Sequence, residues 1–500
     1  MEIERGGKAV RPGRSIRNLI GIAAMLLPVA AWSATYTVGP SGRQYRQLSE
    51  VFAANDLAPG DIVEVDGNAT YDGGIVVDSD DGGSASDPVI IRWRRTDGTT
   101  RPLLKGGQYH TIKFQQSNHV VFEGFEVSGG PNSCIFTEAD DVTVRDVIIR
   151  DCPAHGILGA DQLSGSFTLE YSEIYSTGSG TSRHPIYMQS DEVAFPGSVF
   201  RMRYNYVHSG NGGNLVKVRH ERSEIYYNWL EGAAYQALEF IGPDCWEQPD
   251  GWTTDLKRED ADVVGNVIIQ SSDWANAIRI GGDLNGRSQG RVRLVNNTIL
   301  FTRSGAANAV MVQLGAGSLE MHNNLIHQTT GGAPVIVREN RSVDDMPEPC
   351  SPQRAEPWDG ARKVAGSGNW VKDGAMTPPE WTGTISGSDP RLTDIGQGRL
   401  RPLPGSPLIG RGASRLEGPS AFPFPSPLPS AQFEPPLGRK MDPGNERQRE
   451  DAGRAELDIG ALPSTADAGI AGEQAHAGRK LRKWPAQPPT PYRRDWLPRN

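Results

Sequence analysis

The sequence of 500 residues is poor in cysteine, lacks an excess of basic charge and has only one long apolar run. Its formal net charge of -9 does not favour binding of nucleic acid or anionic lipid, so a polyanionic ligand would need a local patch of basic residues. The four cysteines, Cys134, Cys152, Cys245 and Cys350, lack the CxxC spacing of a zinc site. In an oxidising compartment they allow up to two disulfides with three pairings, and free buried thiols are the alternative.

The apolar run lies within residues 1–34, where basic residues come first, Leu19–Ala31 follows and small residues close the segment. This order is typical of a secretory signal peptide cleaved near Ala34. A membrane anchor is the alternative, but the run is shorter than a bilayer span and contains Pro28. No later segment is long enough to cross a bilayer, so we expect a secreted or periplasmic protein without a membrane span in the mature chain.

A repeat occupies the middle of the chain. Short segments of one design recur, each with a strand, a small or polar residue and a second short apolar stretch. The residues at this turn are Gly124, Asp146, Ser172, Asn205, Asn228, Asn266, Asn297 and Asn324. The intervals between these turn residues are 22 to 38 residues long, which fits the coils of a parallel β-helix. Asparagine suits the turns because its side-chain amide can form a hydrogen bond to the equivalent turn one coil away. A β-sandwich would favour hairpins with two-residue turns, and the sequence has few such signals.

We therefore predict an all-β, right-handed parallel β-helix over residues 35–410, including an N-terminal cap and closing coils. A cap helix is expected at 45–54, where it would close the apolar end of the solenoid. Residues 411–500 are rich in proline and are expected to be extended or disordered. Within them, the motif Leu457-Asp-Ile-Gly460 resembles the motifs that close the solenoid in bacterial β-helix proteins.

A further strand follows each polar turn by about ten residues, and alternation assigns its two faces. The expected inward residues are Ile186, Met188, Val216, Val218, Leu238, Phe240, Ile278, Ile280, Val310, Val312, Val335 and Val337. The expected outward column is Phe136, Leu158, Tyr187, Lys217, Glu239, Arg279 and Met311. Adjacent coils lie roughly 4.8 Å apart, so these outward side chains should touch. A charge ladder that only solubilises an exposed sheet is the structural alternative.

The polar part of this column has the groups for β-elimination of a uronate. That reaction removes the proton α to a carboxylate, so it needs a base, a cation and an acid. Lys217 is the expected base, because Arg219 and Arg279 favour its neutral amine, although Glu239 opposes this. Either arginine could hold the substrate carboxylate bidentately. Tyr187 could act as the acid or, when ionised, as the base.

Other residues are expected to bind substrate around these groups. His184 begins the strand that carries Tyr187 and is expected at the rim of the surface, next to the stacked His155. Gln189 should lie beside Arg219 in a second outward column. Trp246 and Trp252, in the loop after Glu239, could stack on sugar rings and form a wall.

At these residues the chain resembles the polysaccharide lyases with a β-helix fold, such as pectate lyase and chondroitinase B. The resemblance covers roughly Val120–Gly332, as a coil pattern with a strand lysine, Lys217. It implies a lyase that acts on an acidic polysaccharide. Chondroitinase-B-like enzymes carry acidic calcium ligands where this chain has Asn211-Gly-Gly-Asn214, and an arginine where it has Glu239. Calcium is therefore left open, and no other metal or cofactor is assigned.

Three alternatives share the fold. A glycoside hydrolase usually needs two carboxylates about 5 to 9.5 Å apart, for which Asp244 or Asp283 could join Glu239. An epimerase would also fit, but the Asp-Pro-His-Asp phrase of mannuronan epimerases is absent. A glycan-binding or surface-structural solenoid would use the same residues without turnover. The expected partner in each case is a polysaccharide, with no nucleic acid, and the chain is expected to be a monomer.

Overall fold

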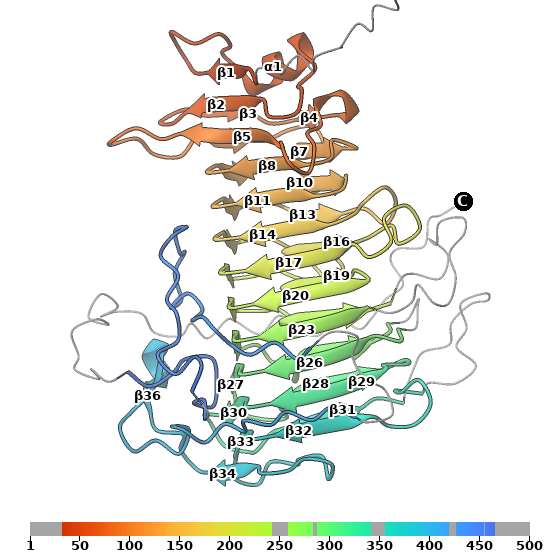
Figure 1. Cartoon of the computed structure of the whole chain (residues 1–500), viewed down its shortest axis with the longest axis vertical. Helices are drawn as coiled ribbons and strands as arrows, with labels where there is room; N and C mark the ends of the chain where they lie inside the picture. Colours follow the sequence, from red (N-terminus) through yellow and green to blue (C-terminus); the bar gives the residue numbers. More distant parts are fainter. Residues whose placement is uncertain are drawn as a thin grey trace, which may run out of the picture.

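The computed structural model describes residues 33–242, 259–283, 288–341, 356–419, 427–454 and 456–465. Three long parallel sheets wind around one apolar core and form a right-handed parallel β-helix (Figure 1). The predicted fold is confirmed. Between β2 and β33 each coil contributes one strand to each sheet in turn, and the strands stack in chain order along the long axis of the molecule.

We call the three sheets A, B and C, in the order in which each coil visits them. Sheet A has 12 strands: β1 (Thr35–Val38), β2 (Ile62–Asp66), β5 (Val89–Arg94), β8 (Val120–Glu123), β11 (Val142–Arg145), β14 (Phe167–Glu170), β17 (Val199–Arg203), β20 (Arg222–Tyr226), β23 (Asp260–Val264), β26 (Arg291–Val295), β29 (Ser318–His322) and β32 (Val364–Ser367). Sheet B also has 12: β3 (Thr70–Asp72), β6 (Leu103–Lys105), β9 (Glu126–Ser128), β12 (Ile148–Arg150), β15 (Glu173–Tyr175), β18 (Tyr206–His208), β21 (Trp229–Glu231), β24 (Val267–Gln270), β27 (Thr298–Phe301), β30 (Leu325–Gln328), β33 (Trp370–Lys372) and β34 (Ile385–Gly387). Sheet C has 10: β4 (Ile75–Val77), β7 (His110–Gln115), β10 (Ser133–Glu138), β13 (His155–Gly159), β16 (Ile186–Gln189), β19 (Val216–Arg219), β22 (Leu238–Ile241), β25 (Asn276–Gly281), β28 (Asn308–Gln313) and β31 (Val335–Glu339).

An asparagine ladder holds the turn between sheets A and B. The Oδ1 atom of Asn228 accepts the backbone N–H and the side-chain amide of Asn205, both at 3.0 Å. The same pair of bonds recurs through the other predicted asparagines and ends on Asn369: Asn228 to Asn266, Asn266 to Asn297, Asn297 to Asn324 and Asn324 to Asn369. All of these side chains are fully buried. Because a buried polar group without a partner costs about 1–3 kcal/mol, the ladder also fixes the register of the coils.

Sheet C turns its expected apolar residues into the core. Those of β16, β19, β22, β25 and β28 are buried, as the alternation predicts. The last strand, β31, differs: Val335 and Val337 are only partly buried, whereas Ile336 between them is fully buried. This strand is the terminal one in its sheet, and on its other side Val335 forms a bridge to Met376, so a short segment takes the place of a further strand.

A short helix and a disulfide support the N-terminal coils. The cap helix α1 spans Leu48–Ala54 and buries Leu48 and Val51. It starts later than expected because Tyr45 forms a bridge to Val38 of β1. Cys134 and Cys152 form a disulfide with a Cα–Cα distance of 5.8 Å. The other two cysteines and the predicted signal peptide, apart from its last two residues, lie outside the described residues.

The C-terminal part is irregular and packs against the solenoid. The antiparallel strands β35 (Leu392–Asp394) and β36 (Arg399–Pro402) flank a short 3-10 helix, Ile395–Gln397. Residues 427–454 then return towards earlier coils, where Phe433 contacts the rings of Tyr204 and Tyr227. No helix among the described residues has the length and apolar content to span a bilayer.

Candidate functional site

The outer face of sheet C carries the predicted polar column. In the strand register, Tyr187 pairs with Lys217, Lys217 with Glu239 and Glu239 with Arg279. Gln189 pairs with Arg219 in the neighbouring column. These residues come from β16, β19, β22 and β25, which are consecutive strands of sheet C. Figure 1 labels β16 and β19. The structure therefore brings the expected residues together, as coil spacing and alternation predict.

Lys217 lies between two carboxylates and above an aromatic ring. Its Nζ atom is 3.3 Å from Asp283 Oδ2 and 3.9 Å from Glu239 Oε2. The same atom lies 5.0 Å from the centroid of the Tyr187 ring. The side chain is 13% exposed, so the ammonium is enclosed by its partners and still reaches the surface. This environment makes Lys217 a well-held cation.

Arg219 connects the phenol to Asp283. Its Nε donates to Tyr187 Oη at 2.9 Å, and its Nη2 donates to Asp283 Oδ2 at 2.8 Å. Arg219 also contacts the carbonyl oxygen of Gly242 and is almost fully buried. The Tyr187 oxygen thus accepts a hydrogen bond from one cation, while a second cation, Lys217, lies over its ring. Tyr187 itself is partly exposed.

Asp283 has a role that the sequence interpretation missed, since it was considered only as an acidic partner for Glu239. It follows β25 and holds Lys217 and Arg219 together. Its place depends on the turn after the strand, where strand alternation makes no prediction. The signal that could have drawn attention to it is the phrase Gly281-Gly-Asp283, because two glycines let the backbone turn sharply.

Glu239 is a buried carboxyl group with three polar neighbours. Its Oε2 accepts from the Asn214 amide at 2.5 Å, and its other oxygen contacts the Arg279 guanidinium. The third neighbour is Lys217. Glu239 is completely buried and Arg279 is 9% exposed. This burial favours a role for Glu239 in positioning the two cations over one in direct contact with substrate.

His155 and His184 form a ladder with Asn214 where the strands of sheet C begin. The backbone N–H of His184 donates to His155 Nδ1 at 3.1 Å, and that of Asn214 donates to His184 Nδ1 at 2.9 Å. Burial lowers the pKa of His155 to about 3 and that of His184 well below its usual range. Both rings are therefore neutral. His184, expected at the exposed rim, is instead 2% exposed, because its ring serves as a hydrogen-bond acceptor for the next coil.

Of the other residues that the sequence suggested for the site, some are described by the structure and some are not. Gln189 is partly exposed, and its side-chain amide donates to the Gly159 carbonyl at 3.4 Å. Trp246 and Trp252, expected as a wall, and Asp244 lie outside the described residues. Asn214 does not fit a calcium ligand, because its amide nitrogen faces Glu239 and its Oδ1 accepts the Gln236 N–H. Among the described residues, no group of three or more His, Cys, Asp or Glu side chains is arranged to hold a metal ion.

Two buried carboxyl groups, Glu192 after β16 and Glu259 just before β23, influence each other electrostatically. Burial raises the pKa of Glu192 to about 9, and the nearby Glu221 and Asp191 carboxylates add to the shift. Burial and the neighbouring Glu192 raise the pKa of Glu259 well above its usual range. Within the described chain, neither carboxyl oxygen of Glu192 has a hydrogen-bond partner, whereas Glu259 contacts Ser288. Both groups are therefore protonated over much of the neutral range.

No family model and no curated protein matches the chain. Among solved structures, it is similar to the pectate lyase Pel9A at 11% identity and a TM-score of 0.47, covering 87% of this chain and 97% of that one. An alginate lyase from Paenibacillus sp. str. FPU-7 matches at 15% identity and a TM-score of 0.37, covering 71% of this chain and 98% of that one. The GH136 lacto-N-biosidase from Eubacterium ramulus matches at 10% identity and a TM-score of 0.39, covering 71% of this chain and 67% of that one. Likenesses at this level carry no argument about the reaction, which must come from the site itself.

Proposed function

We propose that this protein is a polysaccharide lyase that cleaves a polymer containing uronic acid by β-elimination, with Tyr187 as the proton-transferring group. The observation that carries the proposal is the hydrogen bond from Arg219 Nε to Tyr187 Oη, 2.9 Å long, with Lys217 over the same ring. A phenol beside two cations on an outward sheet face combines the base and the positive charge that the reaction needs.

Each group has a defined task in the elimination. The ionised Tyr187 oxygen removes the proton at C5, which is acidic because it lies α to the sugar carboxylate. Negative charge then builds on that carboxylate, where Lys217 stabilises it, while the buried Arg219 holds the Tyr187 oxygen in place. The electron pair forms the C4–C5 double bond as the C4–O bond breaks, and Tyr187 returns the proton to the leaving oxygen. Atoms and charge balance without a metal or another cofactor.

Tyr187 is a better candidate for the base than Lys217. To act as a base, Lys217 would have to give up a proton while its nitrogen faces Asp283 at 3.3 Å and Glu239 at 3.9 Å. Losing that proton would cost both ion pairs. Tyr187 has the opposite surroundings, since cations would offset the charge that its oxygen gains on giving up a proton.

A glycoside hydrolase is less consistent with this site. Hydrolysis by paired carboxylates requires both groups to reach the glycosidic bond. Glu239 is completely buried under Lys217, Arg279 and Asn214, and Asp283 already bridges two cations. A hydrolase built on these residues would have to expose Glu239.

The test is incubation with a panel of uronate polymers while near-ultraviolet absorbance is recorded. Elimination creates unsaturated ends that absorb there, whereas hydrolysis creates saturated ends. We expect a rise with at least one polymer and a fall of about 10²–10⁴-fold in Tyr187→Phe. Tyr175→Phe, on sheet B, is the matched control and should keep its activity. Saturated products from the parent protein would exclude a lyase.

We also propose that residues 1–34 direct export to the periplasm or the medium and are then removed. The support is the order of basic, apolar and small residues in this segment. Mass spectrometry of the mature protein should find a chain that begins near Ala34 or Thr35. A mature chain that retains Arg14 would exclude cleavage.

A further inference from the structure

A second surface with the character of a binding site lies on the outer face of sheet A, which is not the sheet that carries Tyr187. Here the strands β11, β14, β17 and β20 enclose a hollow of about 390 Å³, which we call the sheet A hollow. Its floor consists of Thr143 and Thr168, which are neighbours in the register. Since these side chains are short and the residues around them are long, the outer face is recessed at this point.

Two arginine–glutamate pairs form the walls of the hollow. Arg201 Nε lies 3.2 Å from Glu224 Oε2, and Arg203 Nε lies 2.8 Å from Glu170 Oε2. Each arginine thus uses its Nε for its glutamate. No hydrogen bond from the terminal Nη atoms of either arginine is found within the described part of the chain, so these donors remain for a ligand.

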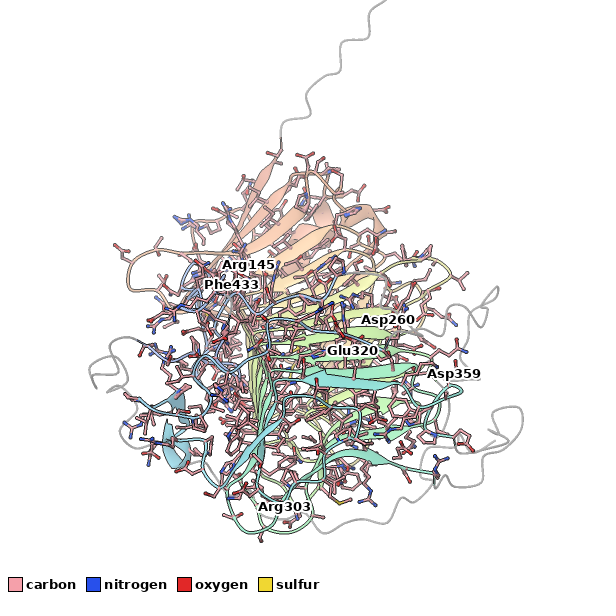
Figure 2. The ribbon with its side chains drawn as sticks, turned by 60° about the horizontal axis from the view of Figure 1, so that its bottom comes forward. Arg145, Asp260, Arg303, Glu320, Asp359 and Phe433 are labelled. Atoms are coloured by element: carbon pink, nitrogen blue, oxygen red, sulfur yellow. A yellow bond between two sulfur atoms is a disulfide. The ribbon has the colours of Figure 1, made fainter. Side chains whose placement is uncertain are left out.

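Exposure is unequal within each pair, and this decides which groups lie at the mouth of the hollow. The Arg201 side chain is 40% exposed and that of Glu224 27%, while Arg203 is 46% exposed and Glu170 10%. A further arginine, Arg145, which is labelled in Figure 2, is 40% exposed, and its Nε lies 3.4 Å from Glu170 Oε1. The guanidinium groups therefore lie outermost and the carboxylates lie deeper. The mouth therefore presents guanidinium donors, although Glu170, Glu224 and the nearby Glu446 balance their charge.

The geometry points to a second binding site, specific for an anionic glycan, in the sheet A hollow. A guanidinium group binds a carboxylate or sulfate through two parallel hydrogen bonds, and Arg201 and Arg203 each offer free donors for this. The half-buried Tyr226 lines the same hollow and provides a ring against which a sugar can pack. The site anchors the glycan without taking part in its cleavage. It does not depend on the proposed reaction, since it lies on another sheet.

Isothermal titration calorimetry on the full chain tests this inference. The chain carries Lys217→Ala, so that binding at sheet C is weakened, and the probes are a galacturonate hexamer, a heparin-derived hexasaccharide, a xylose hexamer and inorganic sulfate. We expect one or both acidic oligosaccharides to bind, more weakly at high salt, and the neutral hexamer not to bind. The two acidic probes separate a preference for carboxylate from one for sulfate. Equal binding of the neutral hexamer would overturn the inference, as would binding of sulfate alone.

Variants then place the binding in the hollow. Arg201→Gln combined with Arg203→Gln should weaken binding of the acidic oligosaccharide about tenfold or more. Arg92→Gln is the matched control, because Arg92 is 37% exposed on the same sheet face and pairs with Glu64 at 2.7 Å. Thr168→Met fills the floor next to Arg201 while both arginines and both glutamates stay in place. It should also weaken binding, and it serves as the second variant if the double variant is unstable. If the double arginine variant and Thr168→Met are both folded and both bind the acidic oligosaccharide with unchanged affinity, the site is refuted.

The outcome is independent of the proposed reaction. Arg201→Gln with Arg203→Gln should leave turnover of short soluble oligosaccharides unchanged, because these residues are not on sheet C. Loss of glycan binding with retained turnover supports an anchoring site. If instead Tyr187→Phe keeps full activity, the proposed reaction fails, and the calorimetric result at sheet A still stands.

Discussion

Asp283 and Lys217 form an ion pair of 3.3 Å between the turn after one strand and the outer face of another, 66 residues apart in the sequence. The same Asp283 oxygen accepts from Arg219 at 2.8 Å, so one carboxylate sets the positions of both cations beside Tyr187. Three strands separated in sequence thereby present one preorganised set of charges. Such preorganisation stabilises a developing negative charge without the rearrangement that water would need.

Asp283→Asn should lower kcat about tenfold, a loss of about 1.4 kcal/mol in transition-state stabilisation, with a smaller change in KM. The amide keeps the shape of the side chain but no longer holds two cations by charge. The measurement is the initial rate of elimination over a range of substrate concentrations. Asp273→Asn is the control, because the Asp273 side chain is 69% exposed and its ion pair with Arg303 is long, at 3.9 Å. A change in KM alone would contradict a positioning role.

Substitutions of Lys217 separate a cation from a base. If Lys217 acts as a cation, Lys217→Arg should keep a measurable part of the activity and Lys217→Ala should lose about 100-fold or more. If it were the base, both should fail, since a guanidinium does not give up its proton near neutral pH. Lys217→Ala should change the free energy of unfolding by less than the roughly 2–5 kcal/mol of a core truncation, which thermal denaturation can verify.

The buried pair of Glu192 and Glu259 predicts that stability falls as pH rises. The pKa of Glu192 is raised from its ordinary 4.5 to about 9, and that of Glu259 is raised as well. Between these values the folded state binds more protons than the unfolded state, so the free energy of unfolding decreases with pH across that window. Glu192→Gln, which is neutral at every pH, should raise the melting temperature at pH 8 and flatten the dependence. Glu417→Gln, at a side chain 71% exposed, should do neither. A parent protein equally stable at pH 5 and pH 8 would contradict the prediction.

The asparagine ladder should contribute strongly to stability. Asn266→Ala removes the acceptor for the backbone N–H and the amide of Asn228. Each donor left unpaired in the core costs about 1–3 kcal/mol, so chemical denaturation should show a loss of that order or more. Asn211→Ala, at an exposed position, should change stability by less than about 0.5 kcal/mol. Similar losses in both variants would argue against a special role for the ladder.

The solenoid and the polar column could be predicted from the sequence, because both follow from regular repeats along the chain. Alternation along a strand and repetition along the axis are enough to place Lys217 next to Glu239 and Tyr187. The same logic identified the ladder asparagines, whose spacing follows the coils. These features need no knowledge of the loops.

The loops carry what the sequence could not predict. Asp283 reaches Lys217 only because of the turn that follows β25. The electrostatic influence of Glu192 on Glu259 likewise joins residues outside the strands. His184 illustrates another limit: its place in the stack was predicted, but its burial depends on the backbone N–H that it accepts from the next coil. Burial in β31 also departs from the pattern, because its outer edge is bridged by Met376 and not by a further strand of the sheet.

The most direct test of the central claim compares parent protein and Tyr187→Phe by near-ultraviolet absorbance on the uronate polymer that the parent degrades best. The phenylalanine variant keeps the ring beneath Lys217 but lacks the oxygen that accepts from Arg219. We predict unsaturated products from the parent and a rate at least about 100-fold lower in the variant, with the fold intact by circular dichroism. A folded Tyr187→Phe variant that eliminates at the parent rate would contradict the assignment of Tyr187.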